Sequence, residues 1–130
     1  MKNILVAGDL SSQDFVNRAY GDLAAVTFAR NVEDARAIIE DCPSTIMVGT
    51  LAFDESRFLS LLPLARSRKI KVVVVDCPYT VLDEATLGAL KAGATELGIS
   101  AWWDMRRTLE VAGTDLAAKE IRAIVRSLLN

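Results

Sequence analysis

The feature that most constrains the fold is a set of strand-length segments that are apolar almost throughout. The clearest are "NILVAG" (3–8), "STIMVGT" (44–50) and "IKVVVVD" (70–76). They lack the strict alternation of apolar and polar residues that marks a strand with one face in water. Strands of this kind are buried on both faces, which is typical of a parallel sheet covered by helices.

Segments with helical spacing separate these strands. We expect strands at 3–8, 24–29, 44–50, 70–76 and 94–100, and helices at 11–23, 32–42, 55–69, 81–93 and 114–130. The regular alternation of strands with helices along the chain predicts an α/β, flavodoxin-like, doubly wound fold. Its five-stranded parallel sheet has the order 2-1-3-4-5, with helices on both faces. At 130 residues, with no visible linker, we expect one domain over 1–130. A site in such a fold lies at the carboxyl ends of strands 1, 3 and 4.

Several residues mark expected helix ends. Asn31 is expected to cap the second helix, which Pro43 ends. The apolar face of that helix consists of Val32, Ala35 and Ile39. Asp54 is expected to cap the third helix, in which Pro63 must cause a kink or a restart. Thr80 is expected to open the fourth helix, and Gly93 to close it as a left-handed cap.

Composition narrows the possible functions. Fifteen basic and seventeen acidic residues give a net charge of −2, so no global field attracts nucleic acid or anionic lipid. The basic run 66–71 is interpreted as a solvated helix end. Histidine is absent, which removes the usual general base, a phosphohistidine carrier and the commonest metal ligand. No apolar run approaches the ~20 residues of a membrane span, and 1–9 has no signal-peptide core. We expect a cytoplasmic protein with no membrane or nucleic-acid partner.

The chain resembles the receiver domains of two-component response regulators along most of its length. The resemblance is carried by "KNILVAGD", "STIMVGT", "KVVVVD" and "ALKAGATELGIS". In that family an acidic pair after strand 1 binds magnesium and an aspartate ending strand 3 accepts the phosphoryl group. A Thr or Ser ends strand 4, and a Lys-Pro pair ends strand 5. The matching positions here are Gly8 and Asp9, Gly49, Asp76, and Ser100 with Ala101.

These matches imply a receiver site without its reaction. Phosphoryl transfer to a protein needs a nucleophilic carboxylate, a cation and a fixed positive group, yet Gly49 has no side chain and Ser100 has no charge. We therefore expect no catalytic residue, metal or cofactor. Asp9 and Asp76 are expected to share a crevice, as two solvated carboxylates or as a weak cation site, with at least one pKa raised by their repulsion. Asp54, the nearest acid, is a helix cap or a displaced phosphoacceptor.

Three functions from different classes remain open. The first is a degenerate receiver, or pseudo-receiver: a non-enzymatic, phosphorylation-independent interaction or regulatory module in bacterial signalling. The alternative is a small-molecule or nucleotide-binding protein that uses the crevice at the strand ends, although the chain has no P-loop and no G-x-G-x-x-G. A third is an enzyme with Cys77 as nucleophile, but the neighbouring Asp76 would raise the pKa of that thiol.

The segment "SAWWDMRRTLEVAG" (100–113) is longer than the strand-to-helix step of the receivers that it resembles. We expect it to run over the surface. Its candidate interface residues are Trp102, Trp103, Met105, Arg106 and Arg107. Aromatic residues and arginine are enriched at binding hot spots, so a protein partner, which could be a second copy in a homodimer, is predicted here. The alternative is that one or both tryptophans fold back over the core as a lid.

Overall fold

A computed structural model describes residues 2–8, 12–42, 44–78 and 82–129. The strands are β1 (Asn3–Ala7), β2 (Ala25–Ala29), β3 (Ile46–Thr50), β4 (Lys71–Asp76) and β5 (Ala101–Asp104). The helices are α1 (Gln13–Tyr20), α2 (Val32–Asp41), α3 (Phe53–Ser56), α4 (Leu62–Ser67), α5 (Glu84–Glu96) and α6 (Met105–Leu129), with a 3₁₀ turn η2 (Phe58–Leu61). The strands form a parallel sheet in the order 2-1-3-4-5. This confirms the predicted fold class.

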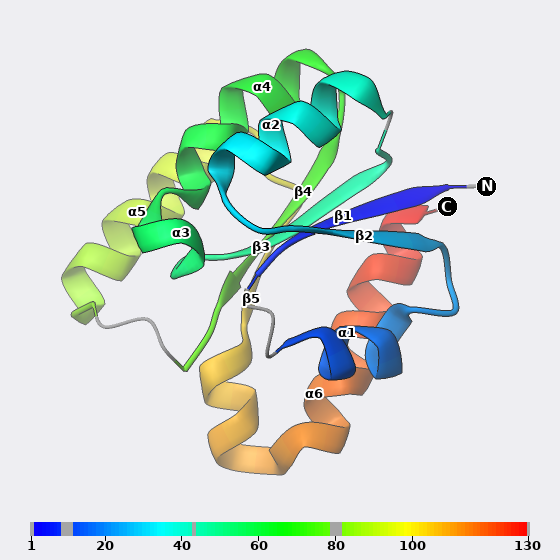
Figure 1. Ribbon diagram of the computed structural model, residues 1–130. Coiled ribbons are helices and arrows are strands. Elements are labelled where there is room, and N and C mark those ends of the chain that lie inside the picture. Colours follow the sequence, from blue (N-terminus) through cyan, green and yellow to red (C-terminus); the bar gives the residue numbers. More distant parts are fainter. Residues whose placement is uncertain (1, 9–11, 43, 79–81, 130) are drawn as a thin grey trace.

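The sheet has a hydrophobic core on each face. Helices α1 and α6 cover one face, and α2, α4 and α5 cover the other (Figure 1). Along β1, Ile4 and Val6 face the first core, whereas Leu5 and Ala7 face the second. Side chains alternate between the faces of a strand, so a central strand with a helix layer on both sides needs apolar residues at successive positions. The continuous apolar runs of the sequence have this origin.

The predicted cap of α2 and the predicted restart at Pro63 are confirmed, although the helix expected over 55–69 is divided into α3, η2 and α4. The Oδ1 atom of Asn31 accepts a hydrogen bond of 2.7 Å from the backbone N–H of Asp34 and so caps α2. The three residues predicted to form its apolar face are buried. Helix α4 restarts with Pro63 in its first turn, where the missing N–H of proline is tolerated. The helix-end predictions for Pro43 and Thr80 fall outside the described residues.

The prediction for the end of α5 was wrong. Gly93 lies inside the helix, which continues to Glu96, and the residue with positive φ is Gly98. The helix persists because the side chain of Ala94 is buried in the second core. Helix α5 is capped at its start by Asp83, whose carboxylate accepts a hydrogen bond of 2.7 Å from the backbone N–H of Thr86. The strand predicted at 94–100 was therefore displaced along the chain, and β5 begins only at Ala101.

Helix α6 consists of two parts with a break at Gly113. Gly113 has φ 84° and ψ −178°, a conformation open essentially only to glycine. The second part, 114–129, corresponds to the predicted last helix. The first part, 105–112, was expected to be a surface segment; instead it begins a helix at once, with the Asp104 carboxylate accepting 3.0 Å from the N–H of Arg107. Among the described helices, none is long and apolar enough to cross a membrane.

Candidate functional site

The structure brings only part of the predicted site together. Gly49 pairs in register with Ala7 on one side and Val74 on the other, and Gly8 and Asp76 lie at the same carboxyl edge of the sheet. Asp9 is outside the described residues. A Cβ atom on Gly8 would lie 3.2 Å from Ser12 Oγ and 3.8 Å from Thr50 Cγ2, so the chain packs closely there.

The prediction that Ser100 and Ala101 end strand 5 was wrong. Ser100 precedes β5, and its N–H donates 2.8 Å to the carbonyl of Val72 near the start of β4. Ala101 is the first residue of β5, and Asp104, which pairs with Asp76, is the last. Strand β5 begins later than predicted because α5 continues to Glu96, with Ala94 buried in the second core. The structure therefore places an acid, Asp104, at the end of strand 5.

The space beside Gly49, the position that the receiver resemblance matches to a phosphoacceptor, is occupied by an aromatic ring. A Cβ atom built on Gly49 would lie 2.0 Å from Cε1 of Phe58. Phe58 belongs to η2, is 0% exposed and packs in the second core. Cβ contacts below 3.0 Å essentially do not occur. The glycine is therefore a steric requirement of this packing.

A turn between β3 and η2 brings Phe58 to this position. Three successive residues that are not glycine, Asp54, Glu55 and Ser56, have positive φ (48°, 57° and 66°). Left-handed backbone costs roughly 1–2 kcal/mol per residue, so contacts must hold the turn. Phe53, which precedes the three residues, is buried in the second core.

Asp54 supplies further contacts, but it does not cap its own helix. Its Oδ2 atom accepts a hydrogen bond of 2.8 Å from the backbone N–H of Val32, at the start of α2. The same atom accepts a second hydrogen bond, of 2.5 Å, from the guanidinium of Arg57. Arg57 also reaches Glu33 at 3.3 Å. The hydrogen bond from Val32, followed by that from Arg57, lowers the pKa of the Asp54 carboxyl. The prediction that Asp54 caps the third helix was therefore wrong: Asp54 has positive φ, and its carboxylate accepts instead from the first N–H of α2.

Asp76 is the one charged residue of the buried set in the described chain, at 4% exposure. Its Oδ2 atom lies 3.2 Å from Nη2 of Arg106 in α6, and its Oδ1 atom has no hydrogen-bond partner among the described residues. Burial raises the pKa of this carboxyl; Arg106 opposes the shift and Asp104 adds to it. The predicted direction holds for Asp76, but burial is the first cause and the like charge described beside it is Asp104.

The described residues do not fit a magnesium ion of the kind that the receiver resemblance implies. Mg²⁺ prefers octahedral oxygen coordination with one or two carboxylates. Gly8 and Gly49 offer no side-chain oxygen, and the guanidinium of Arg106 already lies beside Asp76. No group of three or more Asp, Glu, Cys or His side chains in the described chain could hold a metal ion.

The tryptophans lie in β5 and not in a surface segment, and their packing against the two cores agrees with the alternative that they fold back over the core. Trp102 is half-buried against the second core, whereas Trp103 is 5% exposed in the first. Trp103 stacks on Phe15 with ring centroids 6.4 Å apart, and its Nε1–H donates 2.9 Å to Glu120. Adjacent aromatic residues on a strand point to opposite faces, and here both faces are covered.

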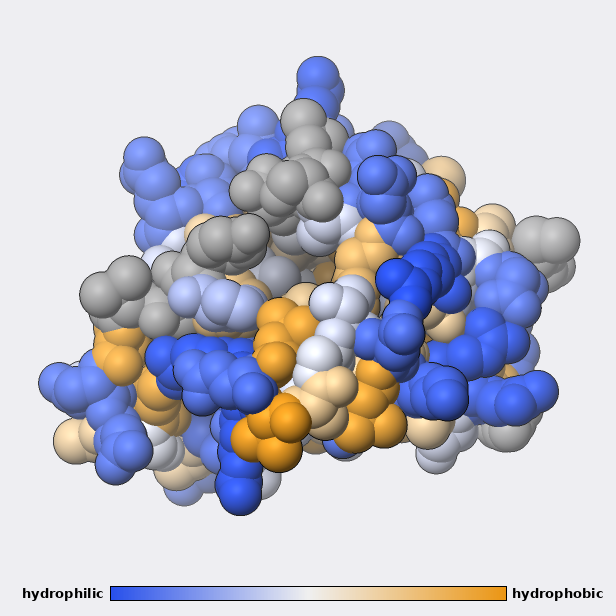
Figure 2. Space-filling view, turned by 90° about the horizontal axis from the view of Figure 1, so that it is seen from below, coloured by the Kyte–Doolittle hydropathy of each residue, from blue (hydrophilic) through white to orange (hydrophobic). Residues whose placement is uncertain are grey.

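The rest of the predicted interface segment begins α6. Met105 and Arg106 are half-buried, and Arg107 is exposed. Arg107 lines a hollow of about 490 Å³ between α5, β5 and α6. Two apolar residues of the same hollow, Val111 (78% exposed) and Leu116 (43%), were missed by sequence reasoning because the spacing around Gly113 hid the helix. The face seen from below, where α6 bends, shows apolar atoms among hydrophilic ones (Figure 2).

Comparison with known proteins identifies the fold. No protein-family model matches the sequence, and no curated protein matches it. A two-component response regulator from Clostridium difficile shares 16% identity over 97% of both chains, with a TM-score of 0.64. The receiver domain of Francisella response regulator 1452 shares 15% identity over 93% of this chain and 99% of that one, with a TM-score of 0.60.

A response regulator from Burkholderia pseudomallei, whose structure holds a phosphorylated aspartic acid, a calcium ion and citrate, is also similar. It shares 18% identity over 95% of this chain and 72% of that one, with a TM-score of 0.61. The chain therefore has the receiver-like, flavodoxin-like fold.

Proposed function

We propose that this chain is a single receiver-like domain, 1–130, that acts through protein contacts and does not require phosphorylation. One observation carries the proposal: the ring of Phe58 fills the space that a phosphoacceptor side chain at Gly49 would need. The module is non-enzymatic and serves in signalling, the role suggested by the similarity to response regulators.

The charges around the edge support the same proposal. A phosphorylated receiver site needs a fixed positive group facing the phosphoryl oxygens. Here Arg106 is paired with Asp76, and β5 ends in Asp104. An entering phosphoryl group would meet two carboxylates and a guanidinium that already has a counter-ion. The charges at this edge of the sheet therefore favour a structure that does not change with phosphorylation.

Intact-mass measurement after incubation with acetyl phosphate and Mg²⁺ tests this proposal. We expect no stable gain of a phosphoryl group, while a receiver with an intact acceptor, treated in parallel, gains one. Asp54→Asn and Asp76→Asn serve as matched variants, because each removes one described acid near the edge. A stable phosphoryl gain in the wild type, whether on Asp9, Asp54 or Asp76, would contradict the proposal, and loss of the gain in either variant would assign it to that residue.

The hollow between α5, β5 and α6 is the proposed contact surface. It combines Val111 and Leu116 with charges of both signs, from Lys91 and Arg107 and from Asp104 and Glu120. A patch that carries both signs around an apolar centre can face a copy of itself across a two-fold axis. We place the self-association contact here. Arg107 and Trp103 of the predicted interface residues line this hollow, whereas Trp102 packs against the second core.

Sedimentation of the wild type against Val111→Glu and Leu116→Glu tests self-association. Both residues are exposed, so the variants should fold; circular dichroism checks this. Leu97→Glu is the matched control, because Leu97 is also exposed (41%) but does not line the hollow. We expect the wild type and the control to associate and the two hollow variants to be monomeric. A wild type that stays monomeric at high concentration would refute self-association and leave a heterologous partner.

A further inference from the structure

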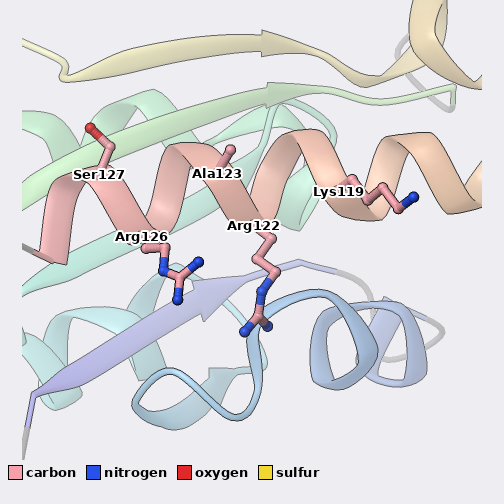
Figure 3. Close-up of a pocket in the computed structure, with 5 residues that line it drawn as sticks. All are labelled: Lys119, Arg122, Ala123, Arg126 and Ser127. Carbon is pink, nitrogen blue, oxygen red and sulfur yellow. The ribbon is translucent and has the colours of Figure 1, made fainter.

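Two shallow hollows flank the same pair of small residues on the second part of α6. The first, about 510 Å³, is lined by Lys119, Arg122, Ala123, Arg126 and Ser127 (Figure 3). The second, about 360 Å³, is lined by Ser100, Ala101, Ala123, Ile124, Ser127 and Leu128. Ala123 and Ser127 belong to both, so the two hollows meet over side chains too small to separate them.

The first hollow is basic. Arg122 is held in place by Asp22, with N–O distances of 2.6 and 2.9 Å, and by the carbonyl of Ala19 at 3.2 Å. Lys119 and Arg126 form no ion pair with any residue in the described part of the chain. Two cations next to a fixed guanidinium, in a chain whose net charge is −2, make this hollow a local positive site.

The second hollow is different in chemistry. Ile124 and Leu128 are half-buried, and each shows part of an aliphatic side chain beside Ala101 of β5. In Figure 3, Ala123 and Ser127 point toward the β5 side of α6, whereas Arg122 and Arg126 point toward α1 and β1. The surface thus presents an aliphatic half and a basic half, joined over the two small residues.

We infer that this surface, which we name the α6 trough, binds an acidic amphipathic segment of a partner protein. Carboxylates of the segment pair with Lys119 and Arg126, and its aliphatic side chains enter the hollow at Ile124 and Leu128. Helix-in-groove recognition uses such a division between an apolar and a charged face. The α6 trough shares no lining residue with the hollow between α5, β5 and α6.

Charge and chemistry favour this occupant over a polyphosphate. Two carboxylates, Asp22 and Asp115, lie along the basic side, each paired with an arginine. They would repel a continuous row of phosphates, whereas Lys119 and Arg126 have no ion-pair partner in the described residues. The aliphatic half offers no group that binds a phosphate.

The test uses a fluorescent helical peptide with Glu on one face and Leu on the other. Two further peptides serve as probes, one with Lys replacing Glu and one with Ser replacing Leu. Anisotropy measures affinity, and amide chemical shifts of labelled protein locate the site. We expect the Glu and Leu peptide to bind at least tenfold more tightly than either probe, to shift amides at residues 119–128, and to weaken at high salt through screening.

Two variants and one control connect binding to the α6 trough. Lys119→Glu with Arg126→Glu reverses the free charges, and Ala123→Gln fills the junction without a charge change; all three positions are exposed helix positions. We expect at least a tenfold loss in each. Arg36→Glu, exposed on α2 at the other face of the sheet, should bind like the wild type.

Several results would overturn the inference: equal binding by the charge-reversed variant, shifts confined to another surface, no peptide binding at all, or binding of a single-stranded oligonucleotide in preference to the peptide. The outcome is independent of the proposed function, because peptide binding here neither requires nor excludes phosphorylation, which the mass measurement reports separately.

Discussion

At the scale of single residues, the contact between Gly49 and Phe58 determines which side chains position 49 can hold. The absence of a carboxylate at position 49 could be read from the sequence. The ring that replaces it could not, because nothing in local sequence indicates that a residue nine positions later returns to the same strand. Arg106 was missed as a partner of Asp76 for the same reason, since their contact depends on α6 beginning at Met105.

Gly49→Ala should destabilise the protein, because its Cβ atom would collide with the ring of Phe58. Overpacking of a core typically costs about 1–3 kcal/mol in the free energy of unfolding. Phe58→Leu added to Gly49→Ala should cost less than the sum of the two single changes. Gly88→Ala is the control, because a Cβ atom there meets nothing within 4 Å. Alanine in place of glycine in a helix should raise the free energy of unfolding by roughly 0.5–1 kcal/mol. Denaturant unfolding measures the four variants and the wild type, and a neutral Gly49→Ala would show that the ring moves freely.

Asp76→Asn should change how stability depends on pH. Burial raises the pKa of the Asp76 carboxyl, so its contribution to stability is present below the ordinary pKa near 4 and is lost as pH rises through the raised value. Asparagine keeps an oxygen facing Arg106 without the charge. The free energy of unfolding of the variant, minus that of the wild type, should therefore increase between about pH 3 and pH 7. A difference that stays constant over that range would contradict the assigned cause.

At the scale of elements, the sequence predicted some helix boundaries and missed others. The cap at Asn31 and the restart at Pro63 were confirmed because each acts through its own backbone position. Gly93 was assigned to the wrong place because a glycine inside a helix and one that ends it look alike without tertiary contacts. That single displacement moved β5, misplaced both tryptophans and assigned Ser100 to the wrong end of the strand.

Gly113 and Gly93 should respond in opposite ways to alanine. Gly113 has φ 84° and ψ −178°, which alanine adopts only at a cost of about 1–3 kcal/mol. Gly93 is helical, and a Cβ atom added there would meet no atom within 4 Å. Gly93→Ala should therefore raise the free energy of unfolding by roughly 0.5–1 kcal/mol. Thermal unfolding of the two variants makes the comparison. A stabilising Gly113→Ala would mean that α6 is continuous, and a destabilising Gly93→Ala would restore the original cap assignment.

At the scale of the whole molecule, the sheet order was predictable because it depends on general rules of handedness and burial. Five parallel strands with helices on both faces admit few topologies. The contact surfaces were not predictable, because each depends on how α6 packs beside its neighbours: Lys91 meets Arg107, and Ala101 meets Leu128.

Amide hydrogen exchange should vary across the sheet with burial. The first four residues of β3 are buried, and β3 pairs on both sides, whereas β2 pairs with β1 alone and has mostly half-buried or exposed residues. Local opening is easiest where few contacts are lost. Amides of β3 should therefore exchange most slowly and those of β2 at least tenfold faster under native conditions, as measured by NMR. Equal rates in β2 and β3 would show that the sheet opens only by global unfolding.

The packing at Gly49 also limits how such a protein could evolve. An aspartate at position 49 cannot be accepted while Phe58 keeps its place, so the aromatic residue would have to change first. Replacing a buried phenylalanine by alanine costs about 3–5 kcal/mol, a large part of the 5–15 kcal/mol by which typical domains are stable. Either first step lowers fitness before the second can repair it. Descendants of this sequence would more readily acquire new partners than regain a phosphoacceptor.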